Sequence, residues 1–176
     1  MNYKKLGLDG LILFMPEKFH DERGYFQESY NKKKFDEIIG RDINFVQDNF
    51  SESIEGVFRG IHFQKKPYEQ GKLVRVSHGK VLDFAVDLRT DSPSYLQWIK
   101  VELSEENGNQ LWIPEGFGHA FLALSKRVHF AYKTTNFYNK ESERCIVWND
   151  PKINIKKSLE GFKLKISNKD KEGDLI

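Results

Sequence analysis

Cysteine is nearly absent from the sequence, since Cys145 is the only one among 176 residues. A single cysteine excludes an intrachain disulfide, and a chain without disulfides is typical of a reducing compartment. Long hydrophobic runs are lacking near the N-terminus as well. The apolar run at residues 11–15 is shorter than a signal-peptide core or a bilayer-spanning segment requires. We therefore expect a cytoplasmic protein with no targeting segment and no membrane contact.

An excess of charge of either sign is also missing. Lys and Arg number 28 and Asp and Glu number 26, so the formal net charge is +2. This balance argues against a nucleic-acid binder that relies on a strongly basic surface. Aromatic residues, in contrast, make up 14% of the chain, enough to pack a β-rich interior. The length suits one domain, which we expect to span residues 1–176.

Short apolar and aromatic stretches, separated by turns rich in glycine and proline, predict about ten strands. They fall at residues 11–15, 25–30, 43–50, 57–64, 71–76, 81–88, 96–103, 110–113, 119–124, 128–135 and 145–148, with a polar loop at 51–56. One helix is expected at residues 32–39, where Asn31 can cap the start and Gly40 can end it. The pattern indicates an all-β sandwich or barrel with one short helix near the N-terminus and an irregular C-terminal segment. By composition alone, residues 167–174 are a solvated tail.

The usual spacing of metal ligands is absent too. Pro114, Gly116 and His119 form the pattern P-x-G-x-x-H, the second half of the cupin signature, but the first half, H-x-H followed by glutamate, is missing. No two histidines have that spacing; they are His20, His62, His78, His119 and His129. Because a metal site needs three or four convergent ligands, the sequence predicts a cupin-like barrel without a metal and disfavours a metal-dependent oxygenase.

Three residues that are costly to bury, Arg59, His62 and Lys72, lie in two expected strands among apolar neighbours. Either they face water, or they line a pocket that binds an anion and moves a proton. Arg59 and His62 are three positions apart, so a regular strand would send them to opposite faces. A bulge at Gly60 would reconcile them; otherwise they reach different ends of a ligand.

Other polar residues of the expected strands are ambiguous one by one. Tyr132 is either a packing residue or, beside a histidine in a barrel lumen, a proton donor. His119 taken alone is a core histidine bonded to the backbone. Asp83 and Asp87 share one face of a strand, where a buried carboxylate orients a histidine or pairs with an arginine.

Several motifs in sequence order resemble the dTDP-4-dehydrorhamnose 3,5-epimerase family. They are Phe58-Arg59-Gly60-Ile61-His62-Phe63-Gln64, Gln70-Gly71-Lys72-Leu73-Val74-Arg75, Asp83-Phe84-Ala85-Val86-Asp87-Leu88-Arg89 and Gln110-Leu111-Trp112-Ile113-Pro114-Glu115-Gly116-Phe117, with further matches at residues 19–30, 45–49 and 132–135. The resemblance runs from about residue 11 to 150 and returns weakly at 167–170.

This resemblance implies a metal-free cupin-type jelly roll without a cofactor, assembled as a homodimer in which N-terminal strands cross between subunits. The implied substrate is a nucleotide diphosphate 4-keto-6-deoxy sugar, used in making a capsule or lipopolysaccharide. A ketone at C4 acidifies the protons at C3 and C5. The chemistry therefore needs a base, an acid on the opposite side and a cation near the developing oxyanion.

The resemblance also implies a role for each matching residue. His62 would be the base, with Asp170 orienting it, Lys72 would stabilise the enolate, and Tyr132 would return the proton. This moves Asp170 from the solvated tail into the site. The substrate-binding residues would be Arg23 and Arg59 on the pyrophosphate, Glu28, Gln47, Asp48 and Asn49 around the nucleotide, Tyr138 stacked on the base, and His119, Glu143 and Lys169 completing the contacts.

Some positions depart from the family pattern, among them Lys157, where tryptophan is frequent, and the loop at residues 65–69. With dTDP-4-dehydro-6-deoxyglucose as the first-choice substrate, three alternatives stay open. The same chemistry could act on a GDP-linked 4-keto heptose, or at C3 or C5 only. A non-catalytic cupin that binds a nucleotide sugar is the third alternative, although a binding module has no need of both an acid and a base.

Overall fold

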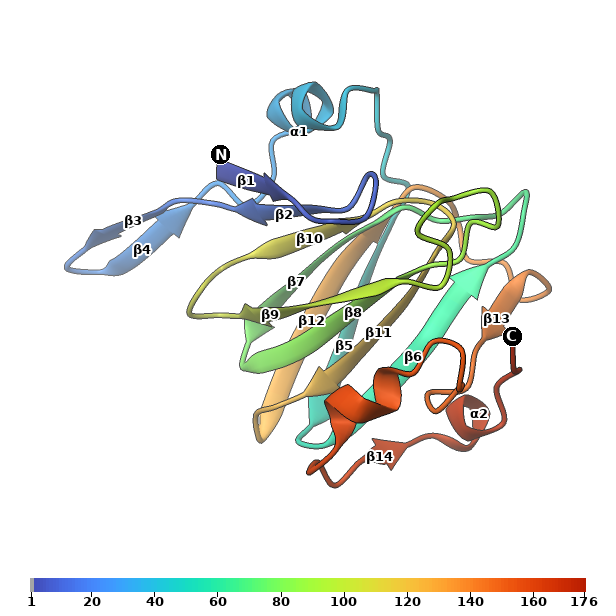
Figure 1. Ribbon diagram of the computed structural model, residues 1–176. Helices are drawn as coiled ribbons and strands as arrows, with labels where there is room; N and C mark the ends of the chain where they lie inside the picture. Colours follow the sequence, from blue (N-terminus) through green and yellow to red (C-terminus); the bar gives the residue numbers. More distant parts are fainter. Residues whose placement is uncertain (1) are drawn as a thin grey trace.

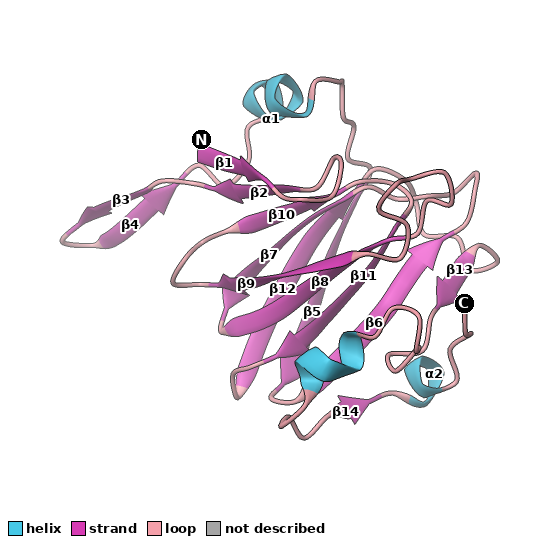
Figure 2. Cartoon of the chain, in the orientation of Figure 1, coloured by secondary structure: helices cyan, strands magenta, loops and turns pink. Residues whose placement is uncertain are grey.

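Alternating side chains along the strands give each sheet two faces; the fold buries the inner face of both sheets and covers parts of the outer faces. The computed structural model describes residues 2–176, which form two antiparallel sheets packed against each other as a jelly roll (Figure 1). Figure 2 shows how strongly strands outnumber helices. The predicted all-β, cupin-like fold is confirmed. No helix within residues 2–176 is long and apolar enough to cross a membrane.

The first sheet has the spatial order β1 (Asn2–Lys5), β2 (Ile12–Met15), β10 (Gln110–Ile113), β7 (Lys72–His78), β12 (Arg127–Thr134) and β5 (Gln47–Ile54). The second sheet has the order β13 (Glu143–Cys145), β6 (Val57–Gln64), β11 (Phe117–Ala123), β8 (Lys80–Asp87) and β9 (Trp98–Ser104), and β14 (Lys165–Ile166) pairs in parallel with β6. A separate hairpin, β3 (Lys18–Asp21) and β4 (Gly24–Gln27), projects away from both sheets (Figure 1). The helices are α1 (Lys32–Ile39), the 3-10 helix η1 (Ile155–Leu159) and α2 (Asn168–Lys171).

The hydrophobic core has three parts, one between the two sheets and one on the outer face of each sheet. The largest part fills the space between the sheets and includes Val74, Ala85, Leu111, Phe121 and Phe130. On the first sheet, α1 lays Phe35 edge-on against Trp112, with ring centroids 5.3 Å apart. On the second sheet, residues 146–159 cover Phe58, Phe84 and Leu122 with a further apolar cluster. The C-terminal segment is thus part of the packed structure.

Local signals predicted α1 correctly to the residue. The Asn31 side chain accepts a hydrogen bond from the Lys34 N–H at 3.2 Å, and Gly40 ends the helix with φ 80°. A left-handed φ of this kind favours glycine, so the helix ends where the sequence indicates.

Several strand boundaries were predicted wrongly, and the pairing partners of the strands explain three of them. The expected loop at 51–56 is mostly strand, because β5 pairs with β12 as far as Ile54 opposite Arg127. The last expected strand, 145–148, lies instead at β13, where Glu143 pairs with Gln64 and Cys145 with His62. The strand expected at 25–30 ends at Gln27, where β4 of the hairpin ends.

The segment at residues 167–174, expected to be a solvated tail, contributes the helix α2.

A bulge at Gly60 places Arg59 and His62 on the same face of β6. His62 pairs with His119 and Arg59 with Phe121, so three steps along β6 match two along β11. The bulge interpretation is therefore correct. Gly60 has φ 124°, and a Cβ there would lie 2.5 Å from the Ala120 Cβ and 2.6 Å from the His119 carbonyl oxygen. Only glycine fits this conformation and this space.

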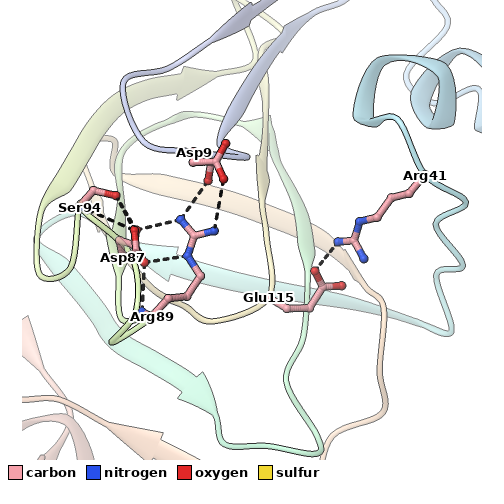
Figure 3. A network of polar contacts seen from close by, with 7 residues as sticks. Asp9, Arg41, Asp87, Arg89, Ser94 and Glu115 are labelled. Atoms are coloured by element: carbon pink, nitrogen blue, oxygen red, sulfur yellow. Dashed lines mark hydrogen bonds and ion pairs between the residues drawn. The ribbon is translucent and has the colours of Figure 1, made fainter.

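A polar network holds the loops at one end of the barrel (Figure 3). Asp87 accepts hydrogen bonds from Arg89 at 2.8 and 2.9 Å and from Ser92 and Ser94 at 2.6 Å. Asp87 therefore pairs with an arginine, as expected for a buried carboxylate. Beside this network, Arg41 pairs with Glu115 and links the segment after α1 to the corner that leads into β11.

Replacement of Gly60 by alanine tests the bulge. Gly60→Ala adds an unfavourable φ and a steric clash with backbone, each worth about 1–3 kcal/mol, so a loss of about 3 kcal/mol or more in unfolding free energy is expected. Urea denaturation followed by circular dichroism measures it.

The matched control is Gly161→Ala. Gly161 also has a positive φ, 87°, but nothing lies within 4 Å of its Cβ position. Only the backbone cost of about 1–2 kcal/mol applies there. Equal losses in the two variants would contradict the close packing assigned to Gly60.

Candidate active site

A hydrogen-bonded pair, His62 and Asp170, connects β6 to α2. His62 Nε2 lies 2.8 Å from Asp170 Oδ1, and the Gly60 N–H donates to Oδ2 at 3.2 Å. Burial raises the pKa of Asp170, but the hydrogen bond and charge of His62 and the bond from Gly60 outweigh it, so this pKa lies below its ordinary value. Asp170 is only 3% exposed. The composition-based prediction of a solvated tail is wrong at this residue, and the resemblance correctly paired it with His62.

The strands of the first sheet contribute Lys72 and Tyr132 to the same interior. Tyr132 is opposite Val74 of β7, and Lys72 is opposite Thr134 of β12. Burial lowers the pKa of Lys72 to about 8, against the opposing charges of Asp83 and Glu143. Burial raises the pKa of Tyr132 above its ordinary value. At neutral pH the interior therefore holds an ammonium group and a protonated phenol.

A second imidazole–carboxylate pair lies beside the first, because His119 of β11 is opposite His62 of β6. His119 Nε2 is 2.9 Å from Asp83 Oδ2, and the ring stacks on Phe130 with centroids 5.8 Å apart. Burial lowers the pKa of His119, against the opposing charge of Asp83. The histidine is therefore neutral at pH 7. Asp83 orients a histidine, one of the two expectations for this carboxylate.

Polar groups of β5 form hydrogen bonds with Arg59 of β6 and with one another. Arg59 donates from Nε to Ser53 Oγ at 3.1 Å and from its terminal nitrogen to the Glu52 carbonyl oxygen at 3.1 Å. Gln47 donates to Asn49 Oδ1 at 2.8 Å. Sequence reasoning missed Ser53 because residues 51–56 were assigned to a loop. The alternation of Ser51 and Ser53 with exposed residues was the available signal.

Three predicted residues meet at the rim of the interior. The Tyr138 hydroxyl donates to Glu143 Oε2 at 3.0 Å, and Lys169 Nζ donates to the same oxygen at 2.6 Å. The Tyr138 N–H donates to Gln47 Oε1 at 3.0 Å. Tyr138 remains 54% exposed.

Three other predicted residues lie apart from this group within one chain. Arg23 is in the turn between β3 and β4, where it pairs with Asp21 at 2.5 Å. Glu28 pairs with Lys34 at 2.8 Å beside α1. Asp48 points out of the sheet to Lys133 at 2.9 Å, because neighbouring strand residues face opposite sides and Asn49 faces inward.

A cavity of about 1160 Å³ adjoins the dyad on the side of the C-terminal segment, and its wall includes Arg59, His62 and Lys169 but not Lys72, Tyr132 or His119. Two cationic side chains beside a histidine suit an anionic ligand that undergoes proton transfer.

One group of potential metal ligands occurs in this region. His62, Cys145 and Asp170 bring ligand atoms within 4.8 Å of one another. His62 Nε2 is already bonded to Asp170, and burial raises the pKa of Cys145 to about 12, so the thiolate that a metal requires is disfavoured. These residues are a poor fit for a metal ion.

Comparison with known proteins gives the family. The family model described as dTDP-4-dehydrorhamnose 3,5-epimerase matches residues 5–176. The dTDP-4-dehydrorhamnose 3,5-epimerase of Shigella flexneri is 54% identical over 155 residues, which are 88% of this chain and 86% of the relative. That of Pseudomonas aeruginosa is 50% identical over 173 residues, 98% of this chain and 94% of the relative.

A solved structure agrees in fold. The Legionella pneumophila dTDP-6-deoxy-D-glucose-3,5-epimerase, crystallised with dTDP-4-keto-L-rhamnose, superposes with a TM-score of 0.92 at 43% identity. The match covers 99% of this chain and 92% of that chain. The chain therefore belongs to the dTDP-4-dehydrorhamnose 3,5-epimerase family.

Proposed function

We propose that this protein is an isomerase that inverts C3 and C5 of a dTDP-linked 4-keto-6-deoxy sugar, with dTDP-4-dehydro-6-deoxyglucose as its substrate. The observation that carries the proposal is the His62–Asp170 pair, with the buried Lys72 and the partly buried Tyr132 on strands of the opposite sheet. Contributions from both sheets and from α2 support treating residues 1–176 as one epimerase domain.

His62 acts as the base. Because its Nε2 proton is donated to Asp170, its Nδ1 lone pair is free to take the proton from C3 or C5 of the sugar. Asp170, held by the Gly60 N–H, then stabilises the imidazolium that forms. The dyad thus fixes the orientation and the tautomer of the ring.

Lys72 and Tyr132 complete the reaction. Loss of the proton places negative charge on the C4 oxygen, and the buried Lys72 ammonium stabilises this enolate more strongly than it could in water. Tyr132 stays protonated at neutral pH because burial raises its pKa, so it can return a proton to the opposite face of the sugar. Repetition at the second carbon completes the double inversion.

The open alternatives differ in their support. The Legionella structure holds a dTDP sugar, which favours dTDP over a GDP-linked heptose. The Shigella and Pseudomonas relatives are both named as 3,5-epimerases, which favours inversion at both carbons. A binding module has no need of an acid, a base and a buried lysine together, which disfavours a non-catalytic cupin. Metal analysis of the purified protein tests the metal-free expectation.

We also propose a homodimer in which the β3–β4 hairpin reaches the partner subunit. The hairpin exposes Phe19, Tyr25 and Phe26 far from the barrel of its own chain. Contact with a second copy would cover these rings and would bring Arg23 and Glu28 to the partner's interior. This arrangement accounts for the separation of both residues from the site in one chain.

Removal of the base tests the proposed function. His62→Ala should lower the epimerisation rate by about a hundredfold or more, the least expected from losing a general base, while dTDP affinity stays nearly unchanged. Exchange at C3 and C5 in deuterated water, followed by NMR with dTDP- and GDP-linked 4-keto sugars, measures the rate. Calorimetry measures dTDP affinity.

His78→Ala is the matched control, since His78 also bonds a carboxylate, Glu105 at 3.0 Å, but is exposed. It should keep the wild-type rate. A normal rate in His62→Ala would remove the base assignment.

Removal of the Tyr132 hydroxyl should separate proton abstraction from inversion. Tyr132→Phe keeps the ring that packs beside Phe130, so the sugar should still exchange deuterium while the yield of inverted product falls by about a hundredfold. Chromatographic analysis of the sugar product after full exchange measures the yield. An unchanged epimer ratio would mean that another group supplies the acid.

The shared site can be tested by mixing inactive variants. Arg23→Ala and His62→Ala proteins, refolded together, should recover about a quarter of the wild-type rate, because half of random dimers are mixed and each has one complete site. Light scattering should show a dimer. A monomer, or mixing without recovery, would contradict the proposal.

A further inference from the structure

We propose that Asp83 is a positioning residue whose negative charge holds the Lys72 side chain in its charged form and fixes the tautomer of His119. The inference rests on the proposed function in one respect, the role of Lys72 beside the enolate. The placement of Asp83 itself is independent of the substrate.

Asp83 is a buried carboxylate with half of its bonding capacity unused. It is 0% exposed, and its one hydrogen-bond partner is His119 Nε2, at 2.9 Å from Oδ2. Oδ1 has no hydrogen-bond partner within residues 2–176. A buried carboxylate oxygen is ordinarily paired, because leaving it without a partner is costly. The negative charge of Asp83 therefore needs compensation from its surroundings.

Lys72 carries the complementary charge. It is 8% exposed, and none of the hydrogen bonds or ion pairs within the described chain involves its Nζ. Lys72 on β7 and Asp83 on β8 belong to different sheets and both face the interior between them, where the field of Asp83 acts on the ammonium. An unpaired cation and an unpaired anion thus share one enclosed space.

The other charged groups around Lys72 do not replace Asp83. Glu143 of β13 also acts on Lys72, but Lys169 already neutralises it at 2.6 Å. His119 of β11 is neutral at pH 7, and Tyr132 of β12 stays protonated. His62 of β6 has its own carboxylate, Asp170. Asp83 is the carboxylate of the interior that no cation contacts directly.

The charged and neutral forms of Lys72 are close in free energy near neutral pH, because burial already lowers the pKa of Lys72 to about 8. Without Asp83 the desolvation of the ammonium would be opposed by less negative charge, and Lys72 would lose its proton near neutral pH. A neutral amine stabilises an enolate oxygen poorly. Asp83 therefore acts on the reaction through Lys72, without contact with the sugar.

His119 depends on the same carboxylate. Because Asp83 accepts from Nε2, the His119 proton is on Nε2 and the Nδ1 lone pair is left as an acceptor. One buried charge thus sets both the protonation of a lysine and the hydrogen-bonding direction of a histidine.

The test is the titration of Lys72 in Asp83→Asn, an isosteric change that removes the charge. The 13Cε NMR resonance of Lys72 in 13C-lysine-labelled protein, assigned with Lys72→Met, gives its pKa without any turnover. We expect a fall of about one unit or more, and the alkaline limb of the kcat/KM profile should move down equally. At pH 8 the protonated fraction then falls from about a half to about a tenth, a fivefold loss of kcat/KM.

Asp87→Asn is the matched control, since Asp87 is also buried on β8 but bonds to Arg89, Ser92 and Ser94. It should lower stability and leave the Lys72 titration unmoved. Asp83→Glu, which restores the charge, should return the pKa of Lys72 toward the wild-type value. If Asp83→Asn does not fold, Asp83→Ser serves, with the same expected fall.

An unchanged Lys72 titration in the charge-removing variant would overturn the inference. So would an equal shift in Asp87→Asn. If the proposed function is wrong, a different result is expected. The protein would then be inactive toward all the 4-keto sugars, while the Lys72 resonance would still respond to Asp83→Asn.

Discussion

The site depends on one hydrogen bond, between His62 in the middle of β6 and Asp170 in the C-terminal helix α2, 108 residues later. For this bond to form, the chain must return to the free edge of β6. There β14 pairs with Val57 and Phe58, and Ile146 exchanges backbone hydrogen bonds with Ile61. The same return covers the outer face of the second sheet with Ile153, Ile155 and Leu159. Packing of the second sheet and orientation of His62, the proposed base, are therefore achieved by one segment.

The three buried carboxylates Asp83, Asp87 and Asp170 differ in the hydrogen bonds that they accept. Asp87 receives a full set of partners from Arg89, Ser92 and Ser94, and it serves the loops. Asp170 receives a backbone N–H and an imidazole. Asp83 receives the His119 ring alone. A group with complete hydrogen bonding stabilises the fold, whereas incomplete bonding leaves a charge whose field extends to its neighbours. The oxygen without a partner thus distinguishes Asp83 from both Asp87 and Asp170.

Features set by local sequence could be predicted, and features set by distant partners could not. The cap at Asn31 and the stop at Gly40 define both ends of α1, and the strands at 57–64 and 110–113 are bounded by their own turns. The extension of β5 to Ile54 depends on β12, more than 70 residues away. The composition of residues 167–174 predicted an exposed Asp170, because its partner His62 lies 108 residues away in the chain. Only the family resemblance paired Asp170 with His62. Arg23 and Glu28 match the family motif, yet lie outside the site of their own chain.

Adjacent residues of α2 contact different parts of the site, Asp170 on the base and Lys169 on Glu143 at the rim. A four-residue helix has no independent stability, so these two contacts and the Ser167 cap hold it in place together. Opening of this helix would disconnect the base and the rim in one step. The two ends of the site are thus thermodynamically linked. A ligand that tightens the rim is therefore expected to strengthen the orientation of His62 as well.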